Sequence, residues 1–390
     1  ILLSYLRQQL SIENTNYLLK TNNNKYHLLA IHGSNEESID NNLLKWTEYE
    51  DSEFMYYLHN QNKISPLKES KIFILKDKED FEDILYDQDK RDREIYIEMN
   101  NKNKLNKCFV FCGQGPQHIN MGYDMCNSFP VFKETIERCD SIWKELTGES
   151  FINKNKIFLP EFKDLDKSDI PINDPIVAQP AIFFYQVALV ELLKSYNILP
   201  DTIIGHSAGE QCAFYASGAI SLEDAIKISY YRSILQQKTA GTGNMLVIAK
   251  SQEDLEKIIK DSDYQETYSS LELACQNDNN SIVLSGSSDK IKELNKYLSE
   301  LKIFNVIIRG NCPFHSSLQD IIKDEILNAT NNITFNNPSI TLISTALGCK
   351  IDVSNYTPDY WWKNIRQKVS FVQGMEYCKD IDLFIEIGPH

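Results

Sequence analysis

The sequence predicts an α/β protein built around a mostly parallel sheet with helices on both faces. Apolar strand-like runs alternate with helix-like runs over residues 105–243 and 306–390. Between them, residues 244–305 follow the order β-α-β-β-α-β, which is the split unit of ferredoxin-like folds. Residues 1–104 also alternate and end in the polar run Asn100–Lys104, which is typical of a linker. We therefore expect a small N-terminal α/β module, a larger body and a subdomain inserted into that body.

Composition excludes several classes of protein. The chain has 390 residues and a net charge of −15, of which −5 falls in residues 1–104, so a nucleic-acid surface is not expected. The nine cysteines occur singly, without a Cys-x-x-Cys pair, which indicates reduced thiols in a cytoplasmic protein and neither disulfides nor a metal site. No apolar run approaches 18 residues, so we expect neither a membrane contact nor a signal peptide. Because the chain begins with Ile1 and stops just after a strand-like run, we expect a piece of a longer polypeptide.

Hydrophobic periodicity places the elements of the N-terminal module. A possible short helix covers Leu2–Leu10. The expected strands are Tyr26–His32, Lys71–Leu75 and Glu94–Glu98, and the expected helices are Glu36–Trp46, Phe54–His59 and Asp80–Tyr86.

The body and the insert follow from the same patterns. In the body we expect strands at Cys108–Cys112, Thr202–Ile204, Ile340–Ser344 and Phe384–Ile387, and helices at Ser128–Leu146, Gln179–Tyr196, Leu222–Leu235 and Leu318–Ala329. Pro175 and Pro180 suit the entry to the second of these helices. In the insert we expect strands at Met245–Ala249, Leu271–Gln276, Ser281–Ser285 and Asn305–Arg309, and helices at Gln252–Lys260 and Lys290–Leu301.

One stretch carries a pattern typical of catalysis. Gly205-His206-Ser207-Ala208-Gly209-Glu210 follows a strand and precedes a helix, with glycines two residues before and after the serine. Such a serine can occupy a sharp strand-to-helix turn that exposes its hydroxyl, and the helix aims free N–H groups at it. An ordinary strand–turn–helix corner that contains a serine by chance is the alternative explanation of this pattern. The context favours Ser207 as a nucleophile.

A serine nucleophile needs a base, and His315 has the best context among the histidines. It lies between a strand end and a helix start, where sites gather in open α/β sheets. A histidine that merely opens a helix is the alternative. No acidic residue is placed to orient its second ring nitrogen, so we expect a backbone carbonyl near Ile387-Gly388 to do so. His206 adjoins Ser207, but in such a turn its side chain should point away from the face of the nucleophile.

Five motifs in fixed order carry a family resemblance. They are Gly113-Gln114-Gly115-Pro116-Gln117, the Ser207 motif, Tyr231-Arg232-Ser233, Phe314-His315-Ser316 and Phe384-Ile385-Glu386-Ile387-Gly388-Pro389-His390. Together they resemble the acyltransferase domain of polyketide synthases and animal-type fatty acid synthases, over residues 105–390. The first hundred residues resemble the linker between the ketosynthase and acyltransferase domains, with a looser match that covers residues 20–104.

The resemblance implies a fold and a set of roles. The body would be α/β-hydrolase-like, with the ferredoxin-like insert forming the other wall of the cleft. Ser207 would be the nucleophile and His315 its base, and the backbone N–H groups of Gln114 and Ala208 would form the oxyanion hole. Arg232 would pair with the free carboxylate of a malonyl group, for which a planar guanidinium is suited.

The resemblance also implies substrates and partners. Malonyl-CoA would acylate Ser207, and the phosphopantetheine thiol of an acyl carrier protein would then accept the acyl group. A ketosynthase domain would be a neighbour on the same polypeptide, and no cofactor would be permanently bound. Phe314, directly before the base, resembles the malonyl-type pattern, because a bulky ring fills the space that an α-methyl group needs. Phe314 could instead simply pack under the following helix. The alternatives for the whole chain are an esterase or thioesterase, and a non-catalytic docking fragment.

Overall fold

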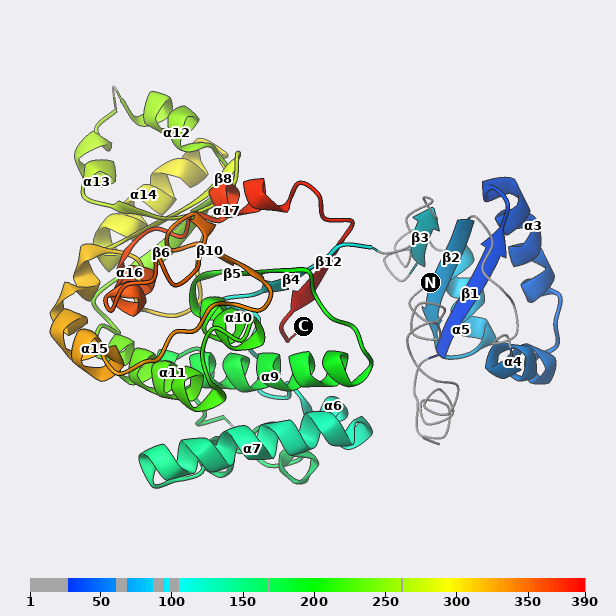
Figure 1. The fold of residues 1–390 in the computed structure, drawn as a ribbon. Coiled ribbons are helices and arrows are strands. Elements are labelled where there is room, and N and C mark those ends of the chain that lie inside the picture. Colours follow the sequence, from blue (N-terminus) through cyan, green and yellow to red (C-terminus); the bar gives the residue numbers. More distant parts are fainter. Residues whose placement is uncertain are drawn as a thin grey trace. The chain divides into compact units, whose positions relative to one another are not determined.

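The computed structural model describes residues 27–60, 69–86, 94–98, 105–166, 168–260 and 262–389. The chain divides into two compact units, one of residues 1–105 with 194–198 and one of residues 106–193 with 199–390 (Figure 1). Each unit is described by itself. The helix expected at Leu2–Leu10 lies outside the described residues.

The first unit is a three-stranded sheet with helices. Strands β1 (His27–Gly33), β2 (Glu69–Leu75) and β3 (Glu94–Glu98) form a sheet in the order β1-β2-β3, with both pairs antiparallel. The helices are α3 (Glu36–Thr47), α4 (Asp51–Asn60) and α5 (Lys78–Tyr86). Asn35 begins α3 as a capping box, because its side chain accepts from the Ser38 N–H while the Ser38 hydroxyl accepts from the Asn35 N–H. All six elements agree with the expected ones to within three residues at each end.

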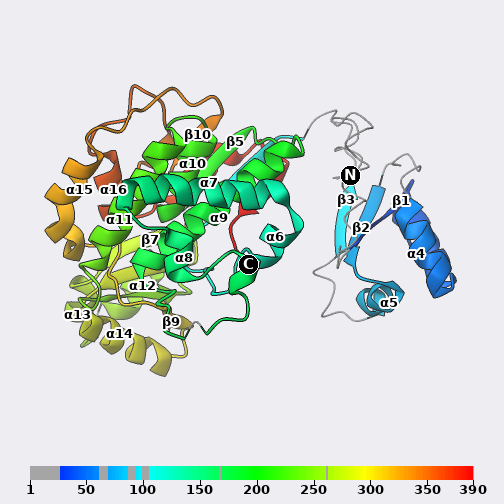
Figure 2. The same cartoon turned by 90° about the horizontal axis from the view of Figure 1, so that it is seen from below.

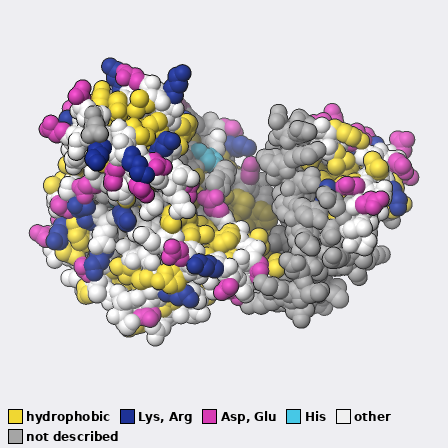
Figure 3. Space-filling view, turned by 90° about the horizontal axis from the view of Figure 1, so that it is seen from above, with side chains coloured by type: hydrophobic (Ala, Val, Ile, Leu, Met, Phe, Trp, Pro, Cys, Tyr) yellow, Lys and Arg dark blue, Asp and Glu magenta, His cyan; other side chains and the backbone are white. Residues whose placement is uncertain are grey.

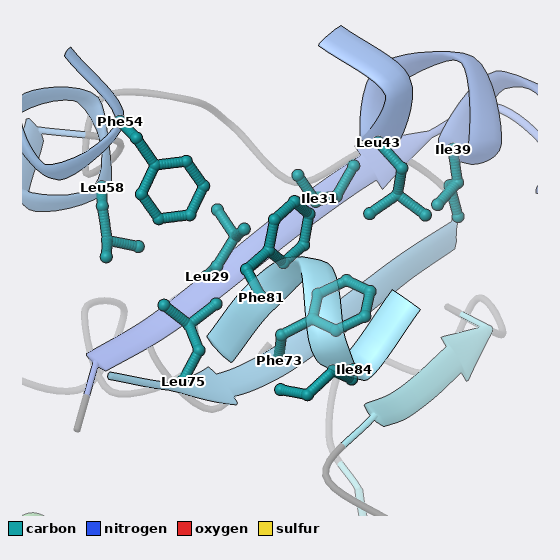
Figure 4. Packing of buried hydrophobic residues seen from close by; sticks show 10 residues of the cluster. All are labelled: Leu29, Ile31, Ile39, Leu43, Phe54, Leu58, Phe73, Leu75, Phe81 and Ile84. Carbon is teal, nitrogen blue, oxygen red and sulfur yellow. The ribbon is translucent and has the colours of Figure 1, made fainter. Parts of the chain in front are cut away.

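Apolar side chains from the sheet and all three helices meet in one core (Figure 4). Phe73 of β2 packs edge-on against Phe81 of α5, and Phe54 of α4 reaches the same ring at 5.5 Å between centroids. These rings are fully buried. This unit therefore has a hydrophobic core of its own, as an independent domain requires.

The larger unit is organised around a five-stranded sheet in the order β11-β10-β5-β4-β12. Its strands are β4 (Lys107–Phe111), β5 (Thr202–Gly205), β10 (Thr341–Ser344), β11 (Cys349–Lys350) and β12 (Leu383–Ile387). All neighbouring pairs are parallel except β10 with β11. Phe111 pairs with Gly205 in register, so the segments that follow β4 and β5 leave the sheet side by side. This juxtaposition brings the Gln114 loop next to the Ser207 turn.

Two long helices form layers beside this sheet, with α7 (Pro130–Thr147) outside α9 (Pro175–Ser195) (Figures 1 and 2). Phe132 of α7 packs on Tyr185 of α9, and Trp143 of α7 packs on Phe184 of α9. By length and hydropathy α9 could cross a membrane, but 72% of its apolar window is buried inside the protein, as in the core helix of a soluble protein.

The expected start of α9 was wrong. The helix begins at Pro175, whose fixed φ suits a first helical position, and it continues through Pro180. A proline inside a helix removes one backbone hydrogen bond and normally ends or bends the helix. Here residues around Pro180 are buried on nearly all sides, so tertiary packing outweighs that cost.

Residues 244–307 form a separate four-stranded antiparallel sheet in the order β7-β8-β6-β9. Its strands are β6 (Asn244–Ile248), β7 (Glu272–Asp278), β8 (Ser281–Gly286) and β9 (Asn305–Ile307). Helices α12 (Gln252–Ile259) and α14 (Ser288–Glu300) occur where the periodicity places them, and α13 (Gln265–Ser269) was not expected. Apolar residues of α12, α14 and this sheet form one core.

The remaining elements connect and cover these sheets. They are α6 (Tyr123–Ser128), α8 (Phe151–Asn155), η3 (Pro160–Phe162), η4 (Ser207–Gly209), α10 (Glu210–Ala216), α11 (Leu222–Gln237), η5 (Ser317–Ile322), α15 (Lys323–Thr330), α16 (Tyr360–Arg366), α17 (Phe371–Met375) and η6 (Glu376–Cys378). On the face drawn in Figure 3, acidic and basic side chains of the larger unit are interspersed, in keeping with the spread of charge along the sequence.

We predict that Gly209→Ala destabilises the protein by about 1–3 kcal/mol, the usual cost of overpacking. A Cβ at this position would lie 2.4 Å from the Phe111 carbonyl oxygen and 2.6 Å from that of Cys112. Gly209 has a helical backbone, so alanine would recover at most about 1 kcal/mol through helix propensity. Chemical denaturation measures the loss. The control is Gly374→Ala, where the nearest atom is the end of the Ile204 side chain, so a smaller loss is expected. Equal losses would contradict the steric account.

Candidate active site

Ser207 occupies a sharp turn between β5 and α10. Its φ is +51°, a left-handed conformation that costs a non-glycine residue about 1–3 kcal/mol. A Cβ at Gly205 would lie 2.6 Å from the backbone nitrogen of Glu210, so the turn needs glycine there as well as at Gly209. The strained backbone and the two close approaches have the geometry expected of a nucleophile elbow.

His315 meets this serine from 108 residues further along the chain. Its Nε2 lies 2.7 Å from Ser207 Oγ, and its side chain is buried. Its Nδ1 lies 2.8 Å from the backbone carbonyl oxygen of Gln367. A carbonyl oxygen can only accept a hydrogen bond, so Nδ1 carries the proton and Nε2 presents a lone pair to the serine hydroxyl. The expected carbonyl near Ile387-Gly388 was wrong, because the segment after α16 reaches the ring instead.

Arg232 of α11 lies beside the same hydroxyl. Its Nη2 donates to Ser207 Oγ at 3.3 Å, and its Nη1 donates to the side-chain oxygen of Gln179 at 2.7 Å. Only 2% of its surface is exposed, so Arg232 is not a surface residue of a helix. Its Nε has no hydrogen-bond partner among the described residues. The guanidinium therefore has donors to spare for a ligand.

Buried glutamine side chains form a hydrogen-bond network that begins at the Arg232 guanidinium. The Gln179 amide nitrogen donates to Gln236 at 2.8 Å and to Gln114 at 3.3 Å. The amide of Gln236 in turn donates to Gln319, whose amide donates to Thr239 and to the Pro313 carbonyl. Since Pro313 precedes Phe314 and His315, this network connects the Arg232 side of the site to the His315 side.

The two expected oxyanion donors flank the serine. Ala208 is the second residue of the short helix η4, where backbone N–H groups have no intrahelical acceptor. The Gln114 loop approaches from β4, and a Cβ at Gly113 would lie 3.6 Å from Ser207 Cβ. The Gln114 side chain donates to the Asn173 carbonyl at 2.8 Å, which holds the loop in place.

Phe314 contributes to two environments at once. It packs on an apolar cluster that includes Met245 of β6 and Val369. It also lines a cleft together with Gln114, Asn173 and Arg309. Residues of the body and Met245 of the four-stranded sheet both line this hollow.

His206, directly after β5, connects the body to the four-stranded sheet. Its Nε2 donates to the side-chain oxygen of Asn277 of β7, at 2.8 Å, and its ring packs on Phe371. As expected for such a turn, this side chain is engaged away from Ser207 Oγ.

Sequence reasoning missed the partners that orient these groups. Gln179 lies on α9 and Gln236 on α11, and both are buried polar residues. A polar residue within an apolar stretch of helix is the only feature of the sequence that could have indicated them. Gln367 acts through its backbone, so its side-chain identity carried no signal.

Burial determines the ionisation of the site. Desolvation, with the positive charge of Arg232 adding to it, lowers the pKa of His315 to about 3, so the imidazole is neutral at neutral pH. Burial lowers the pKa of Arg232 to about 9 while the negative charge of Glu210 opposes that shift. The site therefore holds a neutral base beside a cation.

Comparison with known sequences identifies the family. The family profile described as acyl transferase domain matches residues 108–390. The chain belongs to the acyl transferase domain family. It is 38% identical over 292 residues to probable polyketide synthase 23 of Dictyostelium discoideum, covering 72% of this chain and 11% of that protein. Probable polyketide synthase 2 of the same organism is 34% identical over 400 residues, covering 98% of this chain and 13% of that protein. The chain thus spans about a tenth of the length of these relatives.

Solved structures agree with this assignment. The acyltransferase domain from module 8 of the salinomycin polyketide synthase superposes with a TM-score of 0.76 at 22% identity, covering 93% of this chain and 85% of that one. The acyltransferase domain of SpnD, solved in complex with 2-(pent-4-yn-1-yl)malonyl, superposes with a TM-score of 0.75 at 16% identity, covering 93% and 85% respectively. The mixed α/β fold is therefore that of acyltransferase domains of polyketide synthases.

We predict that His315 does not titrate between about pH 5 and 8, whereas an unperturbed histidine has its midpoint near 6.5. Ring-nitrogen NMR shifts should remain those of a neutral imidazole protonated on Nδ1. The unfolded chain binds a proton there that the folded chain rejects, so this group should lower stability as pH falls below about 6.5. The control is urea-unfolded protein, whose histidines should titrate normally. A folded-state midpoint near 6.5 for His315 would contradict the burial argument.

Proposed function

We propose that this acyltransferase transfers a malonyl-type extender unit from CoA to an acyl carrier protein through an acyl-Ser207 intermediate. The observation that carries the proposal is the position of Ser207 Oγ, 2.7 Å from the neutral nitrogen of His315 and 3.3 Å from a buried guanidinium. A base next to the hydroxyl activates the nucleophile, and a cation next to it favours an acyl group that carries a carboxylate.

The steps follow from these positions. His315 Nε2 takes the proton of Ser207 while Oγ attacks the thioester carbonyl, and the N–H groups of Gln114 and Ala208 bind the resulting oxyanion. The intermediate collapses with loss of the CoA thiolate, which receives the proton from His315. In the second half, the phosphopantetheine thiol of the carrier protein gives its proton to His315 and attacks the acyl-serine ester. Ser207 then leaves with that proton.

Arg232 and Phe314 would select the acyl group. The spare donors of Arg232 suit a bidentate carboxylate partner, and a malonyl derivative is the group bound in the SpnD domain. Phe314 directly precedes His315, and we propose that its ring limits the room for an α-substituent. A single methyl group is worth only about 1–3 kcal/mol in an apolar pocket, so the preference for malonyl over methylmalonyl should be incomplete.

The proposal extends to the context of the domain. The relatives are polyketide synthases, so we propose a carrier protein domain and a ketosynthase domain as partners. Residues 1–104 would serve as the linker to that ketosynthase. We further propose that the body is α/β-hydrolase-like, that residues 244–305 form a ferredoxin-like subdomain, and that the protein acts in the cytoplasm.

The test is intact mass spectrometry after mixing the chain with malonyl-CoA. The wild type should gain the mass of one malonyl group, and Ser207→Ala should gain none. His315→Ala should slow acylation by several orders of magnitude, because the two residues act as a unit. Turnover to free malonate would indicate a hydrolase, and no mass change would indicate a docking fragment. Acylation of Ser207→Ala at the wild-type rate would mean that the nucleophile is another residue.

We also predict that Arg232→Ala lowers kcat/KM for malonyl transfer by about 10- to 150-fold, the equivalent of about 1.5–3 kcal/mol for a charge-assisted bond. Acetyl transfer should be kept or increased, since acetyl has no carboxylate to leave unpaired. Arg232→Lys keeps the charge without the planar fork, so its kcat/KM for malonyl transfer should fall between those of the wild type and Arg232→Ala. Rates with both thioesters on one carrier protein measure this. Equal losses for malonyl and acetyl would make Arg232 a structural residue.

A further inference from the structure

Glu210, the first residue of α10, is a fully buried carboxylate at the base of the Ser207 turn. One of its oxygens accepts from the backbone N–H groups of Thr345 and Ala346 and from the Thr345 hydroxyl. The other accepts from the Tyr360 hydroxyl at 2.6 Å and from the Asn364 amide at 2.8 Å. Burial raises the pKa of Glu210, while the bonds from Tyr360, Ala346, Thr345 and Asn364 oppose that rise.

Asn364 of α16 extends this network to the nucleophile. The same amide nitrogen that donates to Glu210 also donates to the backbone carbonyl oxygen of Ser207, at 3.0 Å. Carboxylate and carbonyl oxygens both only accept, so the amide nitrogen has to face them and the orientation of the side chain is fixed. Both N–H bonds of the amide are thereby used, one on each acceptor.

The Ser207 carbonyl and the Ala208 N–H belong to one peptide unit. That unit is planar and trans, so its carbonyl and its N–H point in opposite directions. A bond that fixes the carbonyl therefore also fixes the direction of the N–H. The Ser207 carbonyl also accepts from the backbone N–H of Glu210 at the end of η4, and the Asn364 amide adds a side-chain restraint to a residue with a left-handed φ.

We propose that Asn364, held by Glu210, is a positioning residue that aims the Ala208 N–H at the oxyanion of the acyl-transfer step. The inference rests on the proposed role of Ser207 as nucleophile. It adds that the Ala208 N–H is oriented by a side chain on the carbonyl side of its peptide, and that this side chain does not touch the substrate. Oxyanion donors act within about 2.7–3.1 Å of the developing charge, so a small rotation of this peptide is costly.

A purely structural role makes a different prediction. Glu210 also ties the end of β10 to α16, so the network could serve only to hold these elements together. In that case, loss of any one donor should lower stability and leave the transition state unaffected. Tyr360→Phe offers the matched control, because it removes a donor from the same carboxylate without removing a contact to Ser207.

The experiment compares Asn364→Ala with Tyr360→Phe in two single-turnover reactions of the chain. One is acylation by malonyl-CoA. The other is labelling by a fluorophosphonate, in which Ser207 Oγ bonds to phosphorus, fluoride leaves, His315 takes the proton and the phosphoryl oxygen develops negative charge. Losing one oxyanion donor costs about 10²–10³ in rate, and misdirecting it should cost part of that. We expect Asn364→Ala to slow both reactions by about 10- to 100-fold, with the half-saturating concentration of malonyl-CoA changed less than about twofold. Tyr360→Phe should slow them less than about threefold, while both variants lower the midpoint of urea unfolding.

The outcomes separate the two proposals. Equal rate losses in Asn364→Ala and Tyr360→Phe, or a change confined to half-saturation, would overturn the positioning role. A wild type that reacts with the fluorophosphonate but not with malonyl-CoA would overturn the proposed substrate, and the labelling rates would still decide the role of Asn364. A wild type that reacts with neither reagent would overturn both proposals.

Discussion

The hydrogen bond from His315 Nδ1 to the Gln367 carbonyl is the interaction on which the site depends. It fixes the tautomer, and only that tautomer presents a lone pair to Ser207. Both ring nitrogens have uncharged partners among the described residues, so the basicity of the ring is set mainly by burial and by Arg232. The imidazole of His315 is therefore neutral at physiological pH. In the proposed mechanism the ring gains charge only when it takes the proton of Ser207.

Two buried ionisable groups, Arg232 and Glu210, act on the electrostatics of the site. Glu210 supports the cationic form of Arg232, and Arg232 disfavours the cationic form of His315. The anion is fully occupied by donors, whereas the cation retains an unpartnered Nε among the described residues. This asymmetry fits the proposed role of Arg232 in binding a carboxylate. Burying an unpaired donor costs free energy, and a bound carboxylate would recover part of that cost.

The sequence predicted those parts of the fold and site that local patterns encode. Periodicity located β4, β5 and α11, and the spacing of glycines located the turn at Ser207. It could not locate the Gln367 carbonyl, because a backbone group carries no residue-type signal and lies 52 residues from His315. It misplaced the start of α9, because tertiary burial overrides the local preference of Pro180. Asn364 gave no signal either, since its role depends on two acceptors that only the folded chain brings together.

The two left-handed residues Ser207 and His315 explain why so much of the polar interior surrounds them. Each has a positive φ, +51° and +57°, and each costs conformational free energy that contacts elsewhere have to offset. Gly209 lets the Ser207 turn approach the backbone at the end of β4 closely, and the Asn364 amide of α16 donates to the Ser207 carbonyl. The Gln319 bond to the Pro313 carbonyl holds the segment before His315. The geometry of the proposed dyad is therefore supported from β4, α16 and η5, and a substitution outside the dyad can still change the alignment of Ser207 with His315.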